Sequence, residues 1–220
     1  SDLYDTIEET YQNYDGEMAL YPREMLRDLL LGLHSMCQGA EAQFFNGHTN
    51  ITSSRFLVFG VKGMLSAAKN VRNAMLFNVL SFMSDKLLTV GNTVAALDEL
   101  YIWLSNPTAI EYIRNCLKRV RKKESAMLLA SQNLEDFDQE GVREMTKPLF
   151  SIPPHQFLFN AGSIDKRSYM DMLQLEESEY NLIKFPQRGV CLYKCGNERY
   201  LLEVHAPAYK AKLFGSAGGR

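Results

Sequence analysis

Short apolar runs alternate with longer helical patterns through the middle of this 220-residue chain, and no other feature restricts the fold as strongly. Runs at residues 55–61 (RFLVFGV), 94–97 (VAAL) and 125–131 (SAMLLAS) have the length and apolar composition of buried strands. Helical patterns at residues 65–88 and 108–122 lie between them. The order strand, helix, strand, helix, strand predicts an α/β sheet with parallel strands and right-handed crossovers.

Further helices are expected before and after this alternating region, and an antiparallel hairpin is expected near the end of the chain. Apolar residues recur at helical spacing at residues 3–14 and 22–37, so the first 38 residues are expected to form a helical lobe. Later helices are predicted at residues 138–150, 163–174 and 176–184, with a strand at 156–160. Residues 189–194 and 199–206 alternate in polarity around Gly196-Asn197, which predicts a hairpin at the sheet edge.

The overall charge and composition argue against several functional classes. A formal net charge of −2 is untypical of a general nucleic-acid binder. No apolar run approaches the roughly 20 residues that span a bilayer, and the acidic residues 1–15 do not resemble a signal peptide. The four cysteines and four histidines lack metal-site spacing, so the cysteines are expected to be reduced, as in a cytosolic protein. Because the chain begins within a helical pattern, we expect a piece of a longer protein.

An acidic pair, Asp98-Glu99, directly follows the apolar run at residues 94–97. In α/β sheets, ligands bind beyond the carboxyl ends of the strands, which is where this pair is expected. There, Asp98 would hold the Mg²⁺ of a nucleotide, directly or through water, and Glu99 would polarise the water that attacks the γ-phosphate. This is the Walker B pattern. Taken alone it is a weak signal, because acidic residues often end a strand or cap the next helix.

Two further features bear on this interpretation. Gln132 follows the next predicted strand, where it would contact a γ-phosphate or would be an ordinary surface glutamine. The helix between the two strands ends in a group of cations: Lys118, Arg119, Arg121, Lys122 and Lys123. Three interpretations are open for this group: a solvated, well-capped helix end, an arginine that reaches a phosphate across a subunit boundary, or a strip that faces DNA.

Together these blocks resemble the motor core of the conjugative-transfer ATPases of type IV secretion systems, the family of the fourth VirB component. The family order is an Asp-Glu strand end, a Pro-containing loop, a helix ending in Arg-Lys and a strand ending in Thr-Gln or Ser-Gln. It is matched by LDELYIWLSNPTAIEYIRNCLKRVRKKESAMLLASQNLEDF. The likeness continues upstream in GAEAQFFNGHTNI and RFLVFGVKGM, and downstream in FLFNAGSIDKRSYMDMLQLEESEYNLI and RGVCLYKCGNERYLLEV. It covers residues 20–214.

The resemblance implies an α/β fold. This would be a RecA-like P-loop NTPase core, with a mostly parallel sheet covered by helices on both faces, an antiparallel edge hairpin and a small N-terminal helical lobe. It divides the chain into a helical lobe and linker (residues 1–45), the C-terminal part of the motor domain (46–214) and a flexible tail (215–220). The implied activity is ATP hydrolysis with Mg²⁺, which powers pilus assembly or the transfer of DNA or protein. The implied partners are other type IV secretion subunits, further copies in a homo-hexamer, and DNA. The implied location is the cytoplasmic face of the bacterial inner membrane, with peripheral membrane association through partners.

Carried over position by position, the resemblance assigns three roles at the strand ends. Asp98 matches the Mg²⁺-associated aspartate, Glu99 the catalytic glutamate and Gln132 the γ-phosphate sensor. Arg121, with Lys122, matches the Arg-Lys block, and either Arg121 or Arg119 would act in trans. The P-loop motif G-x-x-x-x-G-K-[ST] is missing, since no Gly-Lys dipeptide occurs among the 14 glycines. The chain is therefore expected to lack the phosphate-holding half of the site and to be inactive alone.

Two other functions stay open. The chain could be a non-catalytic interaction module of a secretion complex, whose basic helix end and helical lobe dock other subunits. It could also be a fragment of an FtsK-like DNA translocase, which shares the RecA core. An intact P-loop in the upstream sequence would favour the motor, whereas hydrolysis stimulated by DNA and weakened steeply by salt would favour DNA handling.

Overall fold

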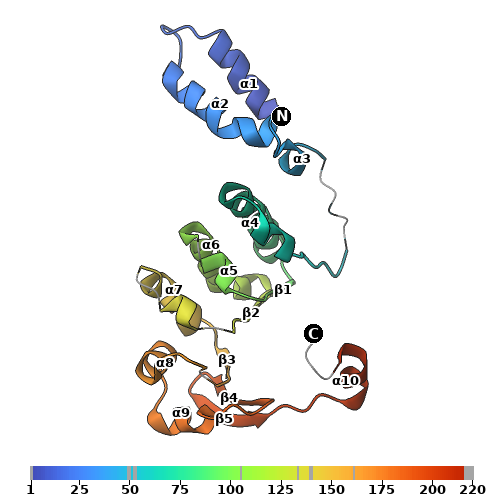
Figure 1. The fold of residues 1–220 in the computed structure, drawn as a ribbon, viewed down its shortest axis with the longest axis vertical. Coiled ribbons are helices and arrows are strands. Elements are labelled where there is room, and N and C mark those ends of the chain that lie inside the picture. The colour runs from blue at the N-terminus through green and yellow to red at the C-terminus, as the bar shows by residue number, and fades with distance from the viewer. Residues whose placement is uncertain are drawn as a thin grey trace. The chain divides into compact units, whose positions relative to one another are not determined.

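The computed structural model describes residues 2–48, 51, 54–104, 106–132, 134–138, 141–160 and 162–215, so the tail predicted at 215–220 lies, apart from its first residue, outside the described residues. The chain divides into two compact units, residues 1–71 and 72–220, each of which is described by itself (Figure 1). The helices are α1 (Asp2–Gln12), α2 (Arg23–Cys37), α3 (Ala42–Phe45), α4 (Lys69–Asp85), α5 (Tyr101–Leu104), α6 (Pro107–Arg119), α7 (Arg143–Ser151), α8 (Lys166–Leu173), α9 (Glu177–Ile183) and α10 (Ala208–Phe214). The strands are β1 (Val94–Leu97), β2 (Ala126–Leu129), β3 (His155–Leu158), β4 (Val190–Cys195) and β5 (Glu198–Glu203). Four short turns of 3₁₀ or π helix join them: η1 (Lys62–Ser66), η2 (Lys86–Val90), η3 (Val120–Lys123) and η4 (Glu135–Phe137).

The first unit is built on α1 and α2, which confirm the helices expected at residues 3–14 and 22–37. Pro22 is the N-cap of α2, as the sequence predicted for a helix that opens at this residue. The two helices bury Tyr4 and Leu26, and the Tyr4 ring meets the His34 ring edge-on with centroids 6.1 Å apart. The opposite face of α1 is polar, so this helix is amphipathic.

The strand expected at residues 55–61 is absent. These residues form bends and irregular backbone, and Phe56 and Val58 are 82% and 77% exposed. The prediction was wrong because apolar composition alone does not make a strand; a neighbouring strand must supply the hydrogen bonds. Among the described residues, no strand pairs with this segment.

The second unit contains a parallel pair of strands, β1 and β2, joined by the crossover helix α6. Val94 lies opposite Ala126 and Leu97 opposite Leu129, which confirms the strands predicted at residues 94–97 and 125–131. α6 begins where the sequence signals it, because the Asn106 side chain accepts a hydrogen bond from the Thr108 N–H and a proline occupies the first helical position. Both strands therefore run in the same direction and end at the same edge.

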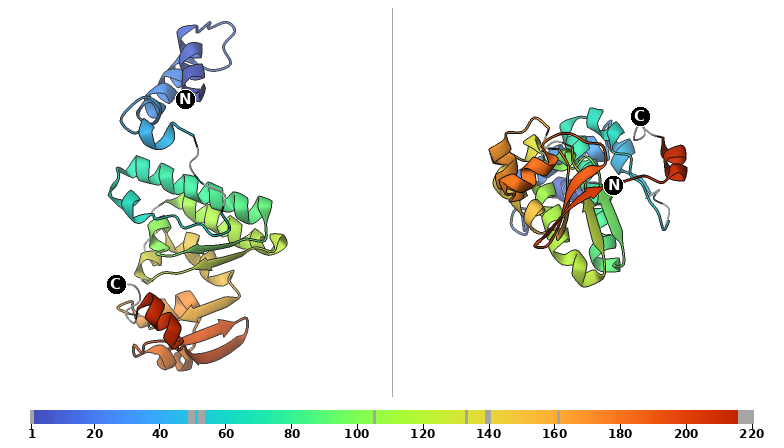
Figure 2. Two further views of the ribbon diagram at one scale, coloured as in Figure 1. Left: turned by 90° about the vertical axis from the view of Figure 1, so that its right-hand side faces the viewer. Right: turned by 90° about the horizontal axis from the view of Figure 1, so that it is seen from below.

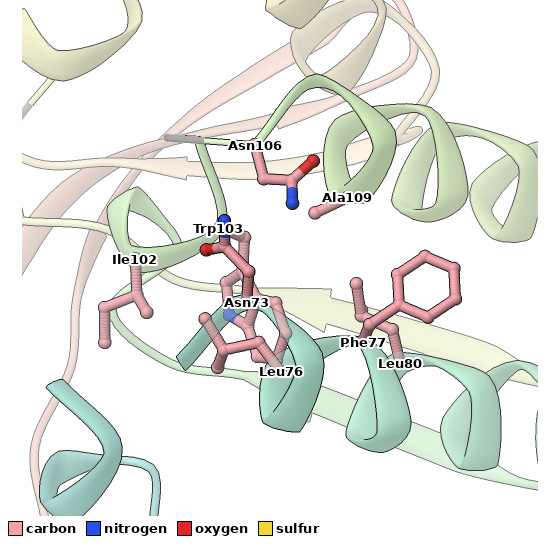
Figure 3. Close-up of a pocket in the computed structure, with 8 residues that line it drawn as sticks. All are labelled: Asn73, Leu76, Phe77, Leu80, Ile102, Trp103, Asn106 and Ala109. Atoms are coloured by element: carbon pink, nitrogen blue, oxygen red, sulfur yellow. The ribbon is translucent and has the colours of Figure 1, made fainter. Parts of the chain in front are cut away.

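The core beside this pair lies between α4, α5 and α6. Leu80, Ile110 and Ile113 are almost fully buried, and the Phe77 and Tyr112 rings pack edge-on with centroids 5.2 Å apart. Figure 3 shows the junction of the three helices, where Trp103 faces side chains of α4. The cavity left there is only about 10 Å³, room for about one water molecule, so the helices are closely packed.

A second, antiparallel sheet has the strand order β3-β4-β5. β4 and β5 form the hairpin predicted around Gly196-Asn197, and the hairpin pairs with β3 through His155 opposite Cys195 and Leu158 opposite Leu192. Leu158 and Leu192 pack with buried residues of α8 and α9, which lie against the sheet in Figure 2. The expected fold class is confirmed as mixed α/β with a parallel sheet and an antiparallel hairpin. Its strands form two sheets because, among the described residues, β2 pairs only with β1 and β3 only with β4.

Gly91, which precedes β1, is expected to be intolerant of substitution. Its φ is +78°, and a Cβ atom there would lie 2.8 Å from the Lys123 carbonyl oxygen. Gly91→Ala should lower the free energy of unfolding by about 2 kcal/mol, through both the left-handed backbone and the clash. Gly141 is the control, because its φ is +81° with nothing within 4 Å of an added Cβ. Urea unfolding of both alanine variants should show that Gly91→Ala lowers the free energy of unfolding more than Gly141→Ala does. Equal decreases in the two variants would contradict a clash at Gly91.

Candidate functional site at the ends of the parallel strands

The polar residues that follow β1 and β2 lie at one edge of the parallel sheet. Backbone hydrogen bonds hold the two strand ends together: Ala130 N–H donates to the Leu97 carbonyl, and Leu100 N–H donates to the Ala130 carbonyl, both at 2.9 Å. The chain leaves β1 through Asp98 and leaves β2 toward Gln132. Parallel pairing of the strands thus brings residues 33 positions apart to the same place.

Glu99 and Gln132 contact each other directly. The Gln132 Nε2 donates to the Glu99 Oε1 at 2.7 Å, a short bond of the kind that a charged acceptor makes. Asp98 turns its own carboxylate back, since Oδ1 accepts the Glu99 N–H at 3.0 Å. Asp98 is exposed and Glu99 is half-buried. The edge therefore presents two carboxylates and one amide, a set that can bind a hard cation and orient a water molecule.

Glu99 has a backbone conformation that is unusual for its residue type. Its φ is +51°, in the left-handed region that only glycine adopts without penalty. For a residue with a Cβ the cost is about 1–2 kcal/mol. The strand-end hydrogen bonds on either side hold the residue in this conformation, and backbone outliers of this kind concentrate at functional sites.

Arg121 lies at the other edge of the same sheet. It belongs to η3, which precedes β2, and Asn92 N–H, just before β1, donates to the Lys123 carbonyl at 2.9 Å. β1 and β2 each have four residues, so this edge is separated from Asp98 and Glu99 by about 13 Å of strand. Within one chain the structure brings Glu99 and Gln132 together, and it keeps Arg121 and Arg119 away from them.

The residues present fit one half of a nucleotide site. The carboxylates at the strand ends are the ligand type that Mg²⁺ prefers. The phosphate-binding half has no counterpart, because the sequence contains no Gly-Lys dipeptide from which a P-loop could be built. Among the described residues, no group of three or more histidine, cysteine or acidic side chains is arranged to hold a metal ion.

A larger cavity that sequence reasoning did not find lies between α7, the end of α8 and the β4–β5 turn. It measures about 890 Å³, and its cationic lining residues are Arg143, Lys147, Lys194 and Arg199. Lys194 is 8% exposed and donates to the Leu173 carbonyl at 2.5 Å. Burial, and secondarily the charge of Arg199, lowers the pKa of the Lys194 ammonium group. These residues come from separate segments, so no local sequence pattern could have joined them.

In the described ranges, no helix is long and apolar enough to cross a membrane.

Known proteins are similar to this chain in sequence and in fold. No family model matches the chain. It is 26% identical over 182 residues to the second portion of the probable conjugal transfer protein TrbE of Sinorhizobium fredii (strain NBRC 101917 / NGR234), covering 76% of this chain and 27% of that protein. The structure matches VirB4 of Thermoanaerobacter pseudethanolicus with a TM-score of 0.78 at 27% identity, covering 96% of this chain and 56% of that chain. This chain thus spans about a quarter of the first relative and about half of the second. In both sequence and fold the chain is therefore similar to the C-terminal part of VirB4-like proteins of type IV secretion and conjugation.

Proposed function

We propose that this chain is the C-terminal portion of an ATP-hydrolysing motor of a type IV secretion or conjugation system. The observation that carries the proposal is the meeting of Glu99 and Gln132 at 2.7 Å, beside Asp98, where two parallel strands end. Such strand ends are where α/β folds bind nucleotides. The similarity to VirB4 and to a conjugal transfer protein supports the same class of function.

The chemistry of the three side chains fits phosphoryl transfer from ATP to water. Asp98 would hold Mg²⁺, directly or through water, and the ion would neutralise charge on the phosphates. Glu99 would accept a proton from the attacking water. The water oxygen would bond to the γ-phosphorus while the bond between that phosphorus and ADP breaks. Gln132 would contact the γ-phosphate. Because Gln132 also donates to Glu99, it would link the phosphate contact to the position of the proposed base.

We propose that Arg121 acts across a subunit boundary, with Arg119 as the alternative. Its place at the opposite edge of the sheet prevents it from reaching the acidic pair of its own chain. A trans arginine requires neighbouring copies, as in a homo-hexamer, and would stabilise charge on the transferred phosphoryl group.

The wider proposal includes a position at the cytoplasmic face of the inner membrane. There the motor would contact other secretion subunits and power pilus assembly or the transfer of DNA or protein.

The first test compares this chain with a longer protein that contains it together with a P-loop. The chain alone should bind ATP weakly and release no phosphate, because nothing in it cradles the β- and γ-phosphates. The longer protein should hydrolyse ATP in a Mg²⁺-dependent way, measured as phosphate release against ATP concentration. Saturable hydrolysis by the 220 residues alone, abolished by Glu99→Gln, would overturn the prediction.

A second candidate function is a non-catalytic interaction module of a secretion complex. The exposed cations at the end of α6 and in η3 favour it, since a charged surface of this kind can dock other subunits. Absence of hydrolysis by the longer protein, despite correct folding, would support this candidate over the motor.

A further inference from the structure

The cavity between α7, the end of α8 and the β4–β5 turn holds positive charge that its own walls do not neutralise. Two of its four cations, Arg143 and Arg199, form ion pairs with carboxylates at 3.4 and 2.8 Å. The other two, Lys147 and Lys194, form no ion pair with any residue that the structure describes. Two acidic residues also line the cavity, but both are exposed to solvent. The cavity therefore favours an anion.

Lys194 has a structural role that accounts for only one of its donors. Its Nζ donates to the carbonyl of Leu173, the last residue of α8, and a lysine at this end of a helix is favourable. An ammonium group has three N–H donors, however. A buried charge also destabilises the fold unless a counter-charge lies beside it. An anion that enters the cavity would supply both the counter-charge and further acceptors.

Gln156 adds an acceptor beside this lysine. It lies directly opposite Lys194 in the antiparallel pair of β3 and β4, so the two side chains share one face of the sheet. The Gln156 Nε2 donates to the Phe150 carbonyl, whereas its buried Oε1 accepts no hydrogen bond from any described residue. Buried polar atoms without a partner are rare in native proteins. A ligand that carries a donor next to its anionic group would satisfy Lys194 and Gln156 together.

The size of the cavity and the placement of its charges favour a small molecule. Its volume of about 890 Å³ lies within the range of about 300–1,000 Å³ that is usual for small-ligand sites. The cations extend from the exposed Lys147 to Lys194, which is 8% exposed, so an anion would be attracted at the surface and held inside. Water could donate to Gln156, but it could not neutralise Lys194.

We propose that this cavity binds a sugar phosphate, with the phosphate beside Lys194 and a sugar hydroxyl donating to Gln156 Oε1. Residues opposite each other in an antiparallel pair have Cβ atoms about 5 Å apart, a spacing that a phosphate and a hydroxyl of one sugar can match. A free sugar phosphate and the ribose phosphate of a nucleotide both offer this chemistry. The proposal does not rest on ATP hydrolysis, because none of the strand-end residues assigned to that reaction lines the cavity.

Isothermal titration of the 220-residue chain with four compounds tests the proposal. Ribose-5-phosphate should bind at least about tenfold more tightly than methyl phosphate, which lacks the hydroxyls, and than ribose, which lacks the charge. AMP distinguishes the two sources. Tighter binding of AMP than of ribose-5-phosphate would assign the cavity to a nucleotide, and weaker binding would assign it to a free sugar phosphate.

Variants of the two unpaired lysines locate the site. Lys194→Gln should weaken the binding of ribose-5-phosphate by at least about tenfold, because it removes the inner charge. Lys147→Glu should weaken it by a similar factor, and it carries the test if thermal unfolding shows that Lys194→Gln is not folded. Lys210→Glu is the matched control, since it makes the same change of charge at an exposed lysine outside the cavity, and its affinity should stay within about twofold.

Three results would overturn the proposal. The first is equal binding of ribose-5-phosphate and methyl phosphate, or no binding of either. The second is equal affinity for ribose-5-phosphate in the Lys147→Glu and Lys210→Glu variants, which would place any binding elsewhere. The third is tighter binding of a tetraglutamate peptide than of ribose-5-phosphate, which would make the cavity a site for an acidic peptide.

Discussion

Glu99→Gln is expected to lower the rate of ATP hydrolysis by about 100- to 10,000-fold in a longer protein that contains this chain and a P-loop. A general base contributes about this factor, and glutamine has no basic oxygen to accept the proton of the attacking water. The substitution keeps the size of the side chain and puts an amide oxygen in place of the carboxylate oxygen, so the hydrogen bond from Gln132 Nε2 can still form. ATP binding should therefore persist while phosphate release is lost. Steady-state phosphate release and fluorescent-nucleotide binding measure the two separately.

Glu124→Gln supplies a matched control for this experiment. Glu124 is exposed and, like Glu99, has a positive φ, +53°, but it lies just before β2 at the opposite edge of the sheet. Its replacement should leave hydrolysis within about twofold of the unchanged protein. A comparable decrease in the hydrolysis rate of both variants would indicate a general disturbance of the fold. It would contradict a role for Glu99 as the base. Loss of nucleotide binding in Glu99→Gln would assign Glu99 to binding instead.

Phe137→Ala is expected to lower the free energy of unfolding by about 3–5 kcal/mol, a large part of the total stability of a domain. Phe137 is 1% exposed, and its ring packs edge-on against Phe150 of α7 with centroids 5.0 Å apart. Its backbone carbonyl also accepts a hydrogen bond from the buried Thr146 hydroxyl at 3.4 Å. Truncation would leave a cavity among side chains that cannot all move to fill it. Urea unfolding followed by circular dichroism gives the measurement.

The matched control for this loss is Phe185→Ala, which removes the same atoms from a side chain that is 71% exposed. Its effect should stay within about 0.5 kcal/mol, as is usual for surface substitutions. If the free energy of unfolding fell by similar amounts in the two variants, the decrease would come from the residue type and not from burial in this core.

The sequence predicted the strand ends well because their signals are local. The run at residues 94–97 coincides with β1, and Asn106 with the proline after it marks the start of α6, since capping and proline placement depend only on neighbouring residues. The convergence of Glu99 and Gln132 follows from parallel pairing. The position of Arg121 follows from the same topology, because a residue just before β2 must lie where the strands begin.

The remaining features depend on contacts between segments distant in sequence. Residues 55–61 have the composition of a strand, but a strand forms only when another strand lies beside it. The pairing of β3 with the hairpin, and not with β2, depends on packing against α8 and α9. The cavity that holds Lys194 is assembled from several elements, none of which carries a recognisable motif.

The left-handed backbone of Glu99 makes glutamate unfavourable for the stability of the fold at a position where the proposed reaction needs its carboxylate. Glycine would fit this φ without penalty, and asparagine at lower cost than glutamate, yet neither could serve as the base of the proposed reaction. Directed evolution for heat resistance alone would therefore tend to replace this glutamate and discard the chemistry with it. Under the proposed reaction, a lineage that retains glutamate here would keep its base at the cost of a less stable fold.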